Sequence, residues 1–219
     1  MGCVSAFGRP GGTDLITRRG LVALGLVPFV PRLARAGGQI EEPLADSVRT
    51  ALAQAVADAA PPRAAFETID GRIAFLAWLG AMSDRLKRHT PDHRQRIDFL
   101  ETLWYESTRA GLEPALVLGL VQVESGFRKF VVSSAGARGY MQVMPFWARL
   151  IGDGDPSKLF HMQTNLRFGC VILRHYLNVE RGDLYFALGR YNGSRGRNEY
   201  PAAVFAARKR WGYSDKSVG

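Results

Sequence analysis

Apolar side chains recur every three or four residues along most of the chain after residue 39, and almost no stretch alternates strictly between apolar and polar residues. A spacing of three to four places such residues on one face of an α-helix, whereas strict alternation favours a β-strand. The pattern predicts helices over residues 45–59, 71–89, 92–110, 115–124, 165–178, 184–191 and 201–211. We therefore expect a mostly α fold.

Glycine and proline mark the boundaries of the central predicted helix. Gly111 is suited to end the helix before it, and Pro114 is suited to its own first turn. Gly126 ends the apolar run that follows. These boundaries place Glu124 at the C-terminus of a short, strongly apolar helix.

The first 36 residues have the order of an export signal. Arg18 and Arg19 precede an apolar run over residues 21–30, and Ala34 and Ala36 then form the small-x-small pattern of a cleavage site. The paired arginines resemble a twin-arginine signal. The run is about ten residues long, too short for a helix that crosses ~30 Å of hydrocarbon, so we expect no membrane span after cleavage. The sequence predicts export to the periplasm.

Charge and residue types narrow the range of partners. The formal net charge of +9 favours an acidic partner, such as nucleic acid, anionic lipid or an anionic cell-wall polymer. The basic residues are scattered and no nucleic-acid-binding motif accompanies them, so we expect no nucleic acid partner. Two cysteines are too few for a disulfide framework. His89 and His93 have no metal-ligand motif around them, and His161 and His175 are far apart in the sequence. We expect no metal and no cofactor.

Glu124 is the strongest candidate for a reacting group. Val121 and Val123 precede it and Phe127 follows it. Apolar neighbours withhold water from a carboxyl group and so raise its pKa, and the partial negative charge of a helix C-terminus acts in the same direction. A carboxyl group that keeps its proton near neutral pH can serve as a general acid. The alternative is a solvated surface glutamate, the usual state of this residue type.

Three segments around Glu124 resemble one enzyme family. They are Glu124-Ser-Gly-Phe127, Ser133-Ser-Ala-Gly-Ala-Arg-Gly-Tyr-Met-Gln-Val-Met-Pro145 and Tyr191-Asn192-Gly193. Together they closely resemble the soluble lytic transglycosylases, glycoside hydrolases with a lysozyme-like fold that act on murein. The resemblance covers roughly residues 99–213. It implies a catalytic domain over residues 99–219, preceded by an N-terminal helical extension over 37–98 and the signal peptide over 1–36.

The resemblance assigns roles to six residues. Glu124 matches the glutamate that protonates the glycosidic oxygen and then removes a proton from the sugar. Five further residues match positions of the saccharide site: Ser133 toward the N-acetyl group, Met141 and Gln142 along the groove, and Tyr191 and Asn192 near the carboxyl group. We expect Glu124 at the floor of a groove that three of these residues wall, namely Met141, Gln142 and Tyr191. Core packing of Met141 and loop capping by Gln142 and Asn192 are the alternatives.

Two positions depart from the family pattern. The family usually has Leu where this chain has Tyr140, and Ala where it has Arg190. Neither change removes a reacting group, but each could alter contacts with the glycan. Arg138 lies in the same loop as Tyr140, where it either holds the loop or meets a carboxylate of a peptide stem.

The family's reaction needs one carboxyl group. The 6-hydroxyl group of the sugar closes on C1 with help from the N-acetyl group and leaves a 1,6-anhydroMurNAc end, whereas ordinary glycosidases use two carboxyl groups. No Asp or Glu lies between Glu124 and Asp153, which is compatible with one carboxyl group. The resemblance implies a lytic transglycosylase that cleaves the MurNAc-GlcNAc β-1,4 bond of peptidoglycan strands. A goose-type lysozyme, which is a hydrolase with a water-positioning carboxylate, and a non-catalytic murein-binding protein are the alternatives.

Overall fold

The computed structural model describes residues 38–57 and 65–214, and these residues are helical with irregular connections. The elements are α1 (Asp46–Ala57), α2 (Ile69–Leu86), α3 (His93–Arg109), α4 (Pro114–Ser125), α5 (Pro145–Ile151), the 3-10 helix η1 (Pro156–Phe160), α6 (Met162–Val179), α7 (Leu184–Asn192) and α8 (Glu199–Trp211). In this described part, extended pairing is limited to two isolated bridges, Val132 with Arg138 and Arg138 with Val143. The prediction of a mostly α fold is confirmed. The predicted signal peptide lies outside the described residues.

All seven predicted helices are present, with shifts at some ends. The predicted helix over 71–89 ends at Leu86, and it begins at Ile69 because the Thr68 side chain accepts a hydrogen bond from the Gly71 backbone N–H. The prediction was wrong in leaving residues 145–160 without helices. Helix α5 has seven residues and η1 has five, so neither is long enough to show a periodic apolar pattern.

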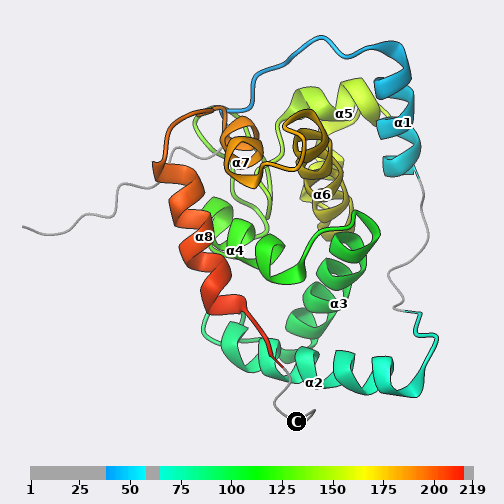
Figure 1. Ribbon diagram of the computed structural model, residues 1–219, viewed down its shortest axis with the longest axis vertical. Coiled ribbons are helices and arrows are strands. Elements are labelled where there is room, and N and C mark those ends of the chain that lie inside the picture. Colours follow the sequence, from blue (N-terminus) through cyan, green and yellow to red (C-terminus); the bar gives the residue numbers. More distant parts are fainter. Residues whose placement is uncertain (1–37, 58–64, 215–219) are drawn as a thin grey trace, which may run out of the picture. The chain divides into compact units, whose positions relative to one another are not determined.

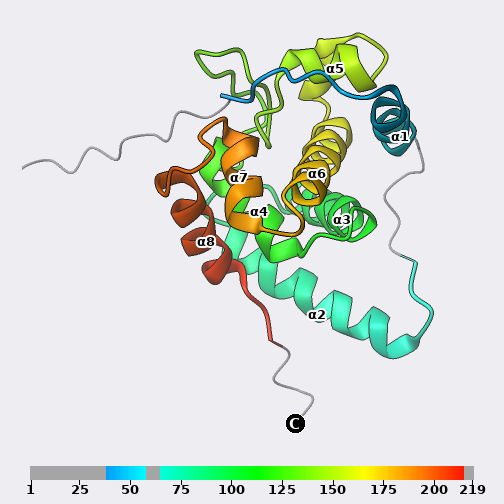
Figure 2. The same cartoon turned by 45° about the horizontal axis from the view of Figure 1, so that its top comes forward.

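Helix α4 forms the centre of the packed core. Every residue from Ala115 to Val121 is buried. Figures 1 and 2 show α4 inside the bundle, with α8 alongside it. Helices α3 and α7 connect this centre to α6, since α4 packs on α3, α7 packs on α8, and both α3 and α7 pack on α6. A helix that is apolar on all sides must be covered on all sides, which fixes α4 between its neighbours.

The contact between α4 and α8 depends on a glycine. A Cβ atom on Gly119 would lie 2.7 Å from the backbone nitrogen of Arg208 and 3.0 Å from its Cα atom. These are backbone atoms, which cannot move aside as the end of a side chain can. The two helices therefore approach as closely as they do only because residue 119 has no side chain.

We expect Gly119→Ala to destabilise the protein, because the new methyl group forces α4 and α8 apart. The overpacking cost should be about 1–3 kcal/mol in the free energy of unfolding. Gly80→Ala is the matched control, because a Cβ atom at this mid-helix glycine of α2 meets nothing within 4 Å. It should stabilise the protein by roughly 0.5–1 kcal/mol through helix propensity. Urea denaturation measures both, and equal midpoints for the two variants would contradict the close approach.

Candidate active site

The Glu124 side chain is buried at the end of α4. The residue is only 6 % exposed. Its Oε1 atom accepts a hydrogen bond of 2.5 Å from the Tyr200 hydroxyl group, and its Oε2 atom has no hydrogen-bond partner among the described residues. Gly126, with a φ of 59°, ends the helix immediately afterwards. The site thus holds a carboxyl group with one polar partner and one unpartnered oxygen.

Burial gives Glu124 the proton that a general acid requires. Desolvation raises the pKa of this carboxyl group from 4.5 to about 8, although the hydrogen bond from Tyr200 acts in the opposite direction. Two of the apolar residues that flank it in sequence, Val121 and Phe127, are themselves buried. The group is therefore mainly protonated at neutral pH and is able to donate a proton to an acceptor placed against it.

Tyr200 is a site residue that the sequence analysis missed. It lies in the first turn of α8, 76 positions from Glu124, and it is buried. Desolvation and the neighbouring Glu124 raise its pKa well above the usual value, so its hydroxyl group stays protonated and donates to the carboxyl group. Its only signal in the sequence was an aromatic residue immediately before the predicted helix over 201–211, which does not distinguish it from a core residue.

Tyr191 lies near the carboxyl group, but its hydroxyl group is occupied. The residue is fully buried, and the hydroxyl donates to the backbone carbonyl of Met141 at 2.7 Å. Burial is the main cause that raises the pKa of Tyr191, and the charge of Glu124 is the next largest. The structure therefore brings α7 and the loop over residues 126–144 together beside the end of α4.

Met141 and Gln142 are both fully buried. A Cβ atom on Gly169 would lie 2.3 Å from the Met141 Sδ atom, so this side chain packs directly on α6. The Gln142 Nε2 atom donates to the carbonyls of Val131 at 3.2 Å and Gly139 at 2.9 Å. These contacts match the alternatives of core packing and loop capping, because neither side chain walls an open groove in this structure. A saccharide contact for either residue stays a prediction.

Ser133 and Asn192 also make local hydrogen bonds. The Ser133 Oγ atom accepts from the Ala137 backbone N–H at 3.1 Å. The Asn192 Nδ2 atom donates to the Ser194 Oγ atom at 2.9 Å, and its Oδ1 atom has no partner among the described residues. Neither residue is fully buried. Their contacts with the sugar stay predictions.

Asn165 of α6 holds the loop that carries Met141, and the sequence analysis did not single it out. Its Oδ1 atom accepts from the Met141 backbone N–H at 2.8 Å, and its Nδ2 atom donates to the carbonyls of Arg138 and Leu159, each at 2.8 Å. Gly139 adopts a φ of 74°, and a Cβ atom there would lie 2.4 Å from the Asn165 Nδ2 atom. The glycine in the Gly-x-Met-Gln motif is thus required by the close approach of a buried amide.

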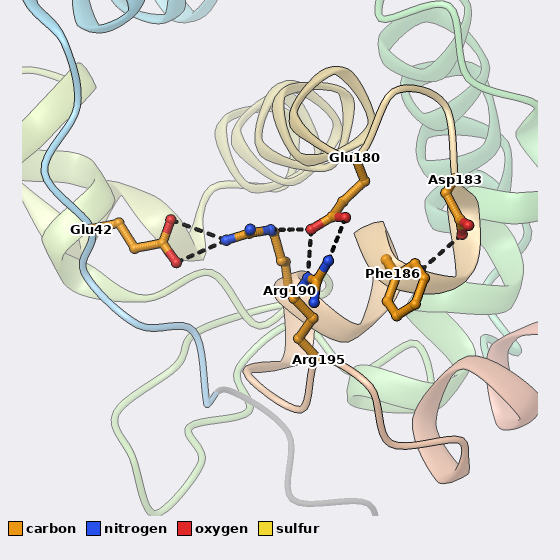
Figure 3. A network of polar contacts seen from close by, with 6 residues as sticks. All are labelled: Glu42, Glu180, Asp183, Phe186, Arg190 and Arg195. Atoms are coloured by element: carbon orange, nitrogen blue, oxygen red, sulfur yellow. Dashed lines mark hydrogen bonds and ion pairs between the residues drawn. The ribbon is translucent and has the colours of Figure 1, made fainter.

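The two departures from the family pattern have structural roles. Tyr140 is buried, with its ring centroid 4.9 Å from that of Phe99. Arg190 forms ion pairs with Glu180 at the end of α6 and, at 3.0 Å, with Glu42 (Figure 3). Arg195 joins this network at 2.7 Å from Glu180.

Arg195, followed by Arg190, lowers the pKa of Glu180 to about 2. The network fastens the segment over residues 38–45 to α7. Arg138 also has a structural contact, since its Nη1 atom donates to the Pro156 carbonyl at 2.8 Å.

Within residues 38–57 and 65–214, no three residues of the types His, Cys, Asp and Glu are grouped as ligands for a metal ion. None of the helices in these two ranges combines the length and the apolar character needed to cross a bilayer.

Comparison with known families identifies the chain. The family model described as "Transglycosylase SLT domain" matches residues 102–212, about half of the sequence. The chain belongs to this family. The matched region begins within α3 and ends just after α8, so it contains Glu124, Tyr191 and Tyr200.

Curated relatives carry consistent names. The chain is 35% identical over 88 residues to membrane-bound lytic murein transglycosylase C of Actinobacillus pleuropneumoniae serotype 5b (strain L20), a match that covers 37% of this chain and 21% of that protein. It is 33% identical over 107 residues to a transglycosylase of Enterobacteria phage PRD1, covering 48% of this chain and 38% of that protein. The chain therefore spans well under half the length of these relatives.

A solved structure is also similar. It is an X-ray structure of an inactive mutant of the lytic transglycosylase Slt from Pseudomonas aeruginosa. The match has 20% sequence identity and a TM-score of 0.47, and it covers 64% of this chain and 29% of that one.

The raised pKa of Glu124 predicts a pH-dependent stability. The carboxyl group titrates near 4.5 when exposed and at about 8 in the folded protein. Between these values unfolding releases a proton, so the contribution of Glu124 to stability is complete below pH 4.5 and is lost as the pH rises toward 8. The slope should be at most about 1.4 kcal/mol per pH unit. Glu124→Gln, which is neutral throughout, should remove this slope.

Urea denaturation across this pH range measures the effect as the difference between wild type and variant. Glu67→Gln is the control, because Glu67 is exposed and its loss should leave the pH dependence unchanged. If the curves of wild type and Glu124→Gln run parallel from acid to alkaline pH, the carboxyl group does not carry a raised pKa.

Proposed function

We propose that this chain is a murein lytic transglycosylase that cleaves the MurNAc-GlcNAc β-1,4 bond of peptidoglycan and leaves a 1,6-anhydroMurNAc end. The observation that carries the proposal is the burial of the Glu124 carboxyl group at the end of α4, within a transglycosylase SLT domain. Burial raises the pKa of this group and so favours its protonated form. The names of the relatives, lytic murein transglycosylase and transglycosylase, support the same substrate and reaction class.

In the proposed reaction Glu124 acts twice. Its carboxyl group first donates a proton to the glycosidic oxygen, which leaves as a hydroxyl group while the N-acetyl group assists at C1. The resulting carboxylate then accepts the proton of the 6-hydroxyl group as that oxygen bonds to C1. The carboxyl group ends protonated, as it began, and no water is consumed.

The neighbours of Glu124 support both steps. The low-polarity surroundings favour the protonated form that starts the reaction. Once the proton has left, the Tyr200 hydroxyl group, 2.5 Å away, donates to the carboxylate and stabilises its charge. We propose Ser133, Met141, Gln142, Tyr191 and Asn192 as the saccharide-binding residues, as the family resemblance implies.

A hydrolase of the goose-lysozyme type is the second candidate. That reaction needs a further carboxylate to position water. Among the described residues, Tyr200 supplies the one hydrogen bond to the Glu124 carboxyl group. The ends of the released products distinguish the two reactions. A non-catalytic murein-binding protein would bind glycan without turnover.

We propose that the protein is exported and acts in the periplasm. A reporter fused after Ala36 should reach the periplasm, and changing Arg18 and Arg19 together to Lys should reduce its export, because a twin-arginine signal requires the guanidinium pair. Fractionation of cells that carry each fusion measures this. Normal export of the double variant would identify a different export route, and retention of the unchanged fusion in the cytoplasm would overturn the proposal.

We expect Glu124→Gln to abolish turnover while leaving folding and glycan binding intact, because the amide keeps the size of the side chain but cannot donate the proton. General acid and base assistance is worth about 10²–10⁴ in rate, and one group here supplies both. Ser133→Ala should cost less, because it removes a hydrogen-bonding group and not the reacting one.

The measurement is mass spectrometry of the products released from purified sacculi, with thermal melts to establish folding. Near-normal release by a folded Glu124→Gln protein would overturn the mechanism. Products with reducing muramic ends, released by the wild type, would instead establish a hydrolase.

A further inference from the structure

A short segment before α1, residues 38–42, packs against the end of α7 and lies outside the region that the family model matches. A Cβ atom on Gly193 would lie 1.7 Å from the carbonyl oxygen of Gly38. A Cβ atom on Gly38 would in turn lie 2.7 Å from the carbonyl oxygen of Asn192. The two backbones therefore touch directly at the turn that follows Tyr191, where neither glycine leaves room for a side chain.

Gln39 places an amide group in the interior next to this contact. The residue is only 5 % exposed, and its Oε1 atom accepts a hydrogen bond of 2.9 Å from the indole N–H of Trp147 on α5. Burial raises the pKa of Tyr191, and the side chain of Gln39 acts in the opposite direction, so the amide lies beside the Tyr191 hydroxyl group. One side chain of the segment thus bridges α5 and α7.

Tyr191 extends this bridge to the loop over residues 126–144. Its hydroxyl group donates to the Met141 carbonyl at 2.7 Å, and both residues are fully buried. Trp147 lies in the first turn of α5, which begins at Pro145 directly after the loop. Gln39 and Tyr191 therefore connect Trp147 back to Met141, and this connection closes a ring around the C-terminal end of the loop.

The unpartnered polar atoms of the interior gather around Tyr191. Among the described residues, four buried side-chain atoms have no hydrogen-bond partner, namely Gln39 Nε2, Glu124 Oε2, Gln142 Oε1 and Asn192 Oδ1. Gln39 and Glu124 both act on the pKa of Tyr191, Asn192 follows Tyr191 in the chain, and Gln142 follows Met141. Because buried polar atoms are usually hydrogen-bonded, such a cluster is typical of a functional site. Gln39 belongs to the same cluster as the reacting carboxyl group.

We propose that Gln39 is a positioning residue for strand cleavage. Through Tyr191 it holds the loop over residues 126–144, which carries proposed saccharide-binding residues, in the place that the reaction at Glu124 requires. This inference rests on the proposed function. A displacement of the loop by about 1 Å would orient the bound sugar less well, which slows the reacting step more than it weakens binding. The segment before α1 thereby takes part in catalysis without touching the substrate.

The test measures kcat and KM on soluble murein strands for two single variants and their combination. Gln39→Leu removes both polar atoms, and it should lower kcat about ten- to a hundredfold while KM changes less than about threefold. Tyr191→Phe removes the hydroxyl group through which Gln39 acts, so it should lower kcat by a similar factor. The double variant should lose no more than the larger of the two single losses. Losses that multiply would show that Gln39 does not act through Tyr191 and would overturn the proposal.

Two controls separate positioning from a general loss of stability. Leu52→Ala leaves a cavity beneath α1, so it should lower the melting temperature at least as much as Gln39→Leu does but leave kcat unchanged. Glu41→Ala changes an exposed residue of the same segment and should match wild type in both measurements. If kcat instead falls in step with the melting temperature in Gln39→Leu and Leu52→Ala alike, Gln39 only stabilises the fold and the proposal is wrong.

Failure of the proposed function is distinguished by the wild type together with NMR spectra of the variants. The backbone amide signals of residues 131–143 should shift in Gln39→Leu and stay in place in Leu52→Ala. If wild type cleaves no murein, the transglycosylase assignment is wrong, and these signals still decide whether Gln39 positions the loop. If wild type cleaves murein and Gln39→Leu does so with an unchanged kcat, the function stands and the inference about Gln39 is wrong.

Discussion

The burial of one carboxyl group at the end of α4 is the constraint on which the rest of the site depends. Removing Glu124 from water is costly for its charged form, and this cost keeps the group protonated near neutral pH. The cost stays limited only while Tyr200 remains in hydrogen-bonding distance, which requires α8 to lie against α4. Gly119, five positions before Glu124 on the same helix, permits that approach of the two backbones and so helps to set the protonation state of the carboxyl group.

A second buried glutamate in the same domain shows what a different partner does. The Glu106 carboxylate pairs with Arg167 at 2.8 Å and with Arg109 at 3.3 Å, and Arg109 also donates to the Ala55 carbonyl at 2.6 Å. This ion-pair cluster joins α3 to α6 and holds the C-terminal turn of α1. Glu106 and Glu124 thus differ in their partners, although both are buried. Guanidinium groups pair with the Glu106 carboxyl group, whereas a phenol hydroxyl group donates to that of Glu124.

The sequence predicted the helices and the burial of Glu124 better than it predicted the contacts around that carboxyl group. The apolar period located α3, α4 and α6, and the valines beside Glu124 predicted its desolvation, because both signals are local. The sequence did not predict the roles of Tyr200 and Asn165, because these roles arise from contacts with segments far away in the sequence. Met141 matched a family position, but only the packing on Gly169 shows that its side chain is in the core.

The segment before α1 lies outside the region that the family model matches, yet it is fastened to the site. Gln39 accepts a hydrogen bond from the Trp147 indole at 2.9 Å, and Glu42 pairs with Arg190 at 3.0 Å (Figure 3). Arg190 immediately precedes Tyr191 on α7, so the segment is attached to the helix that reaches toward Glu124. Arginine at a position where relatives usually have alanine is therefore explained by this attachment. The departure from the family pattern couples the segment before α1 to the shared domain and leaves Glu124 unchanged.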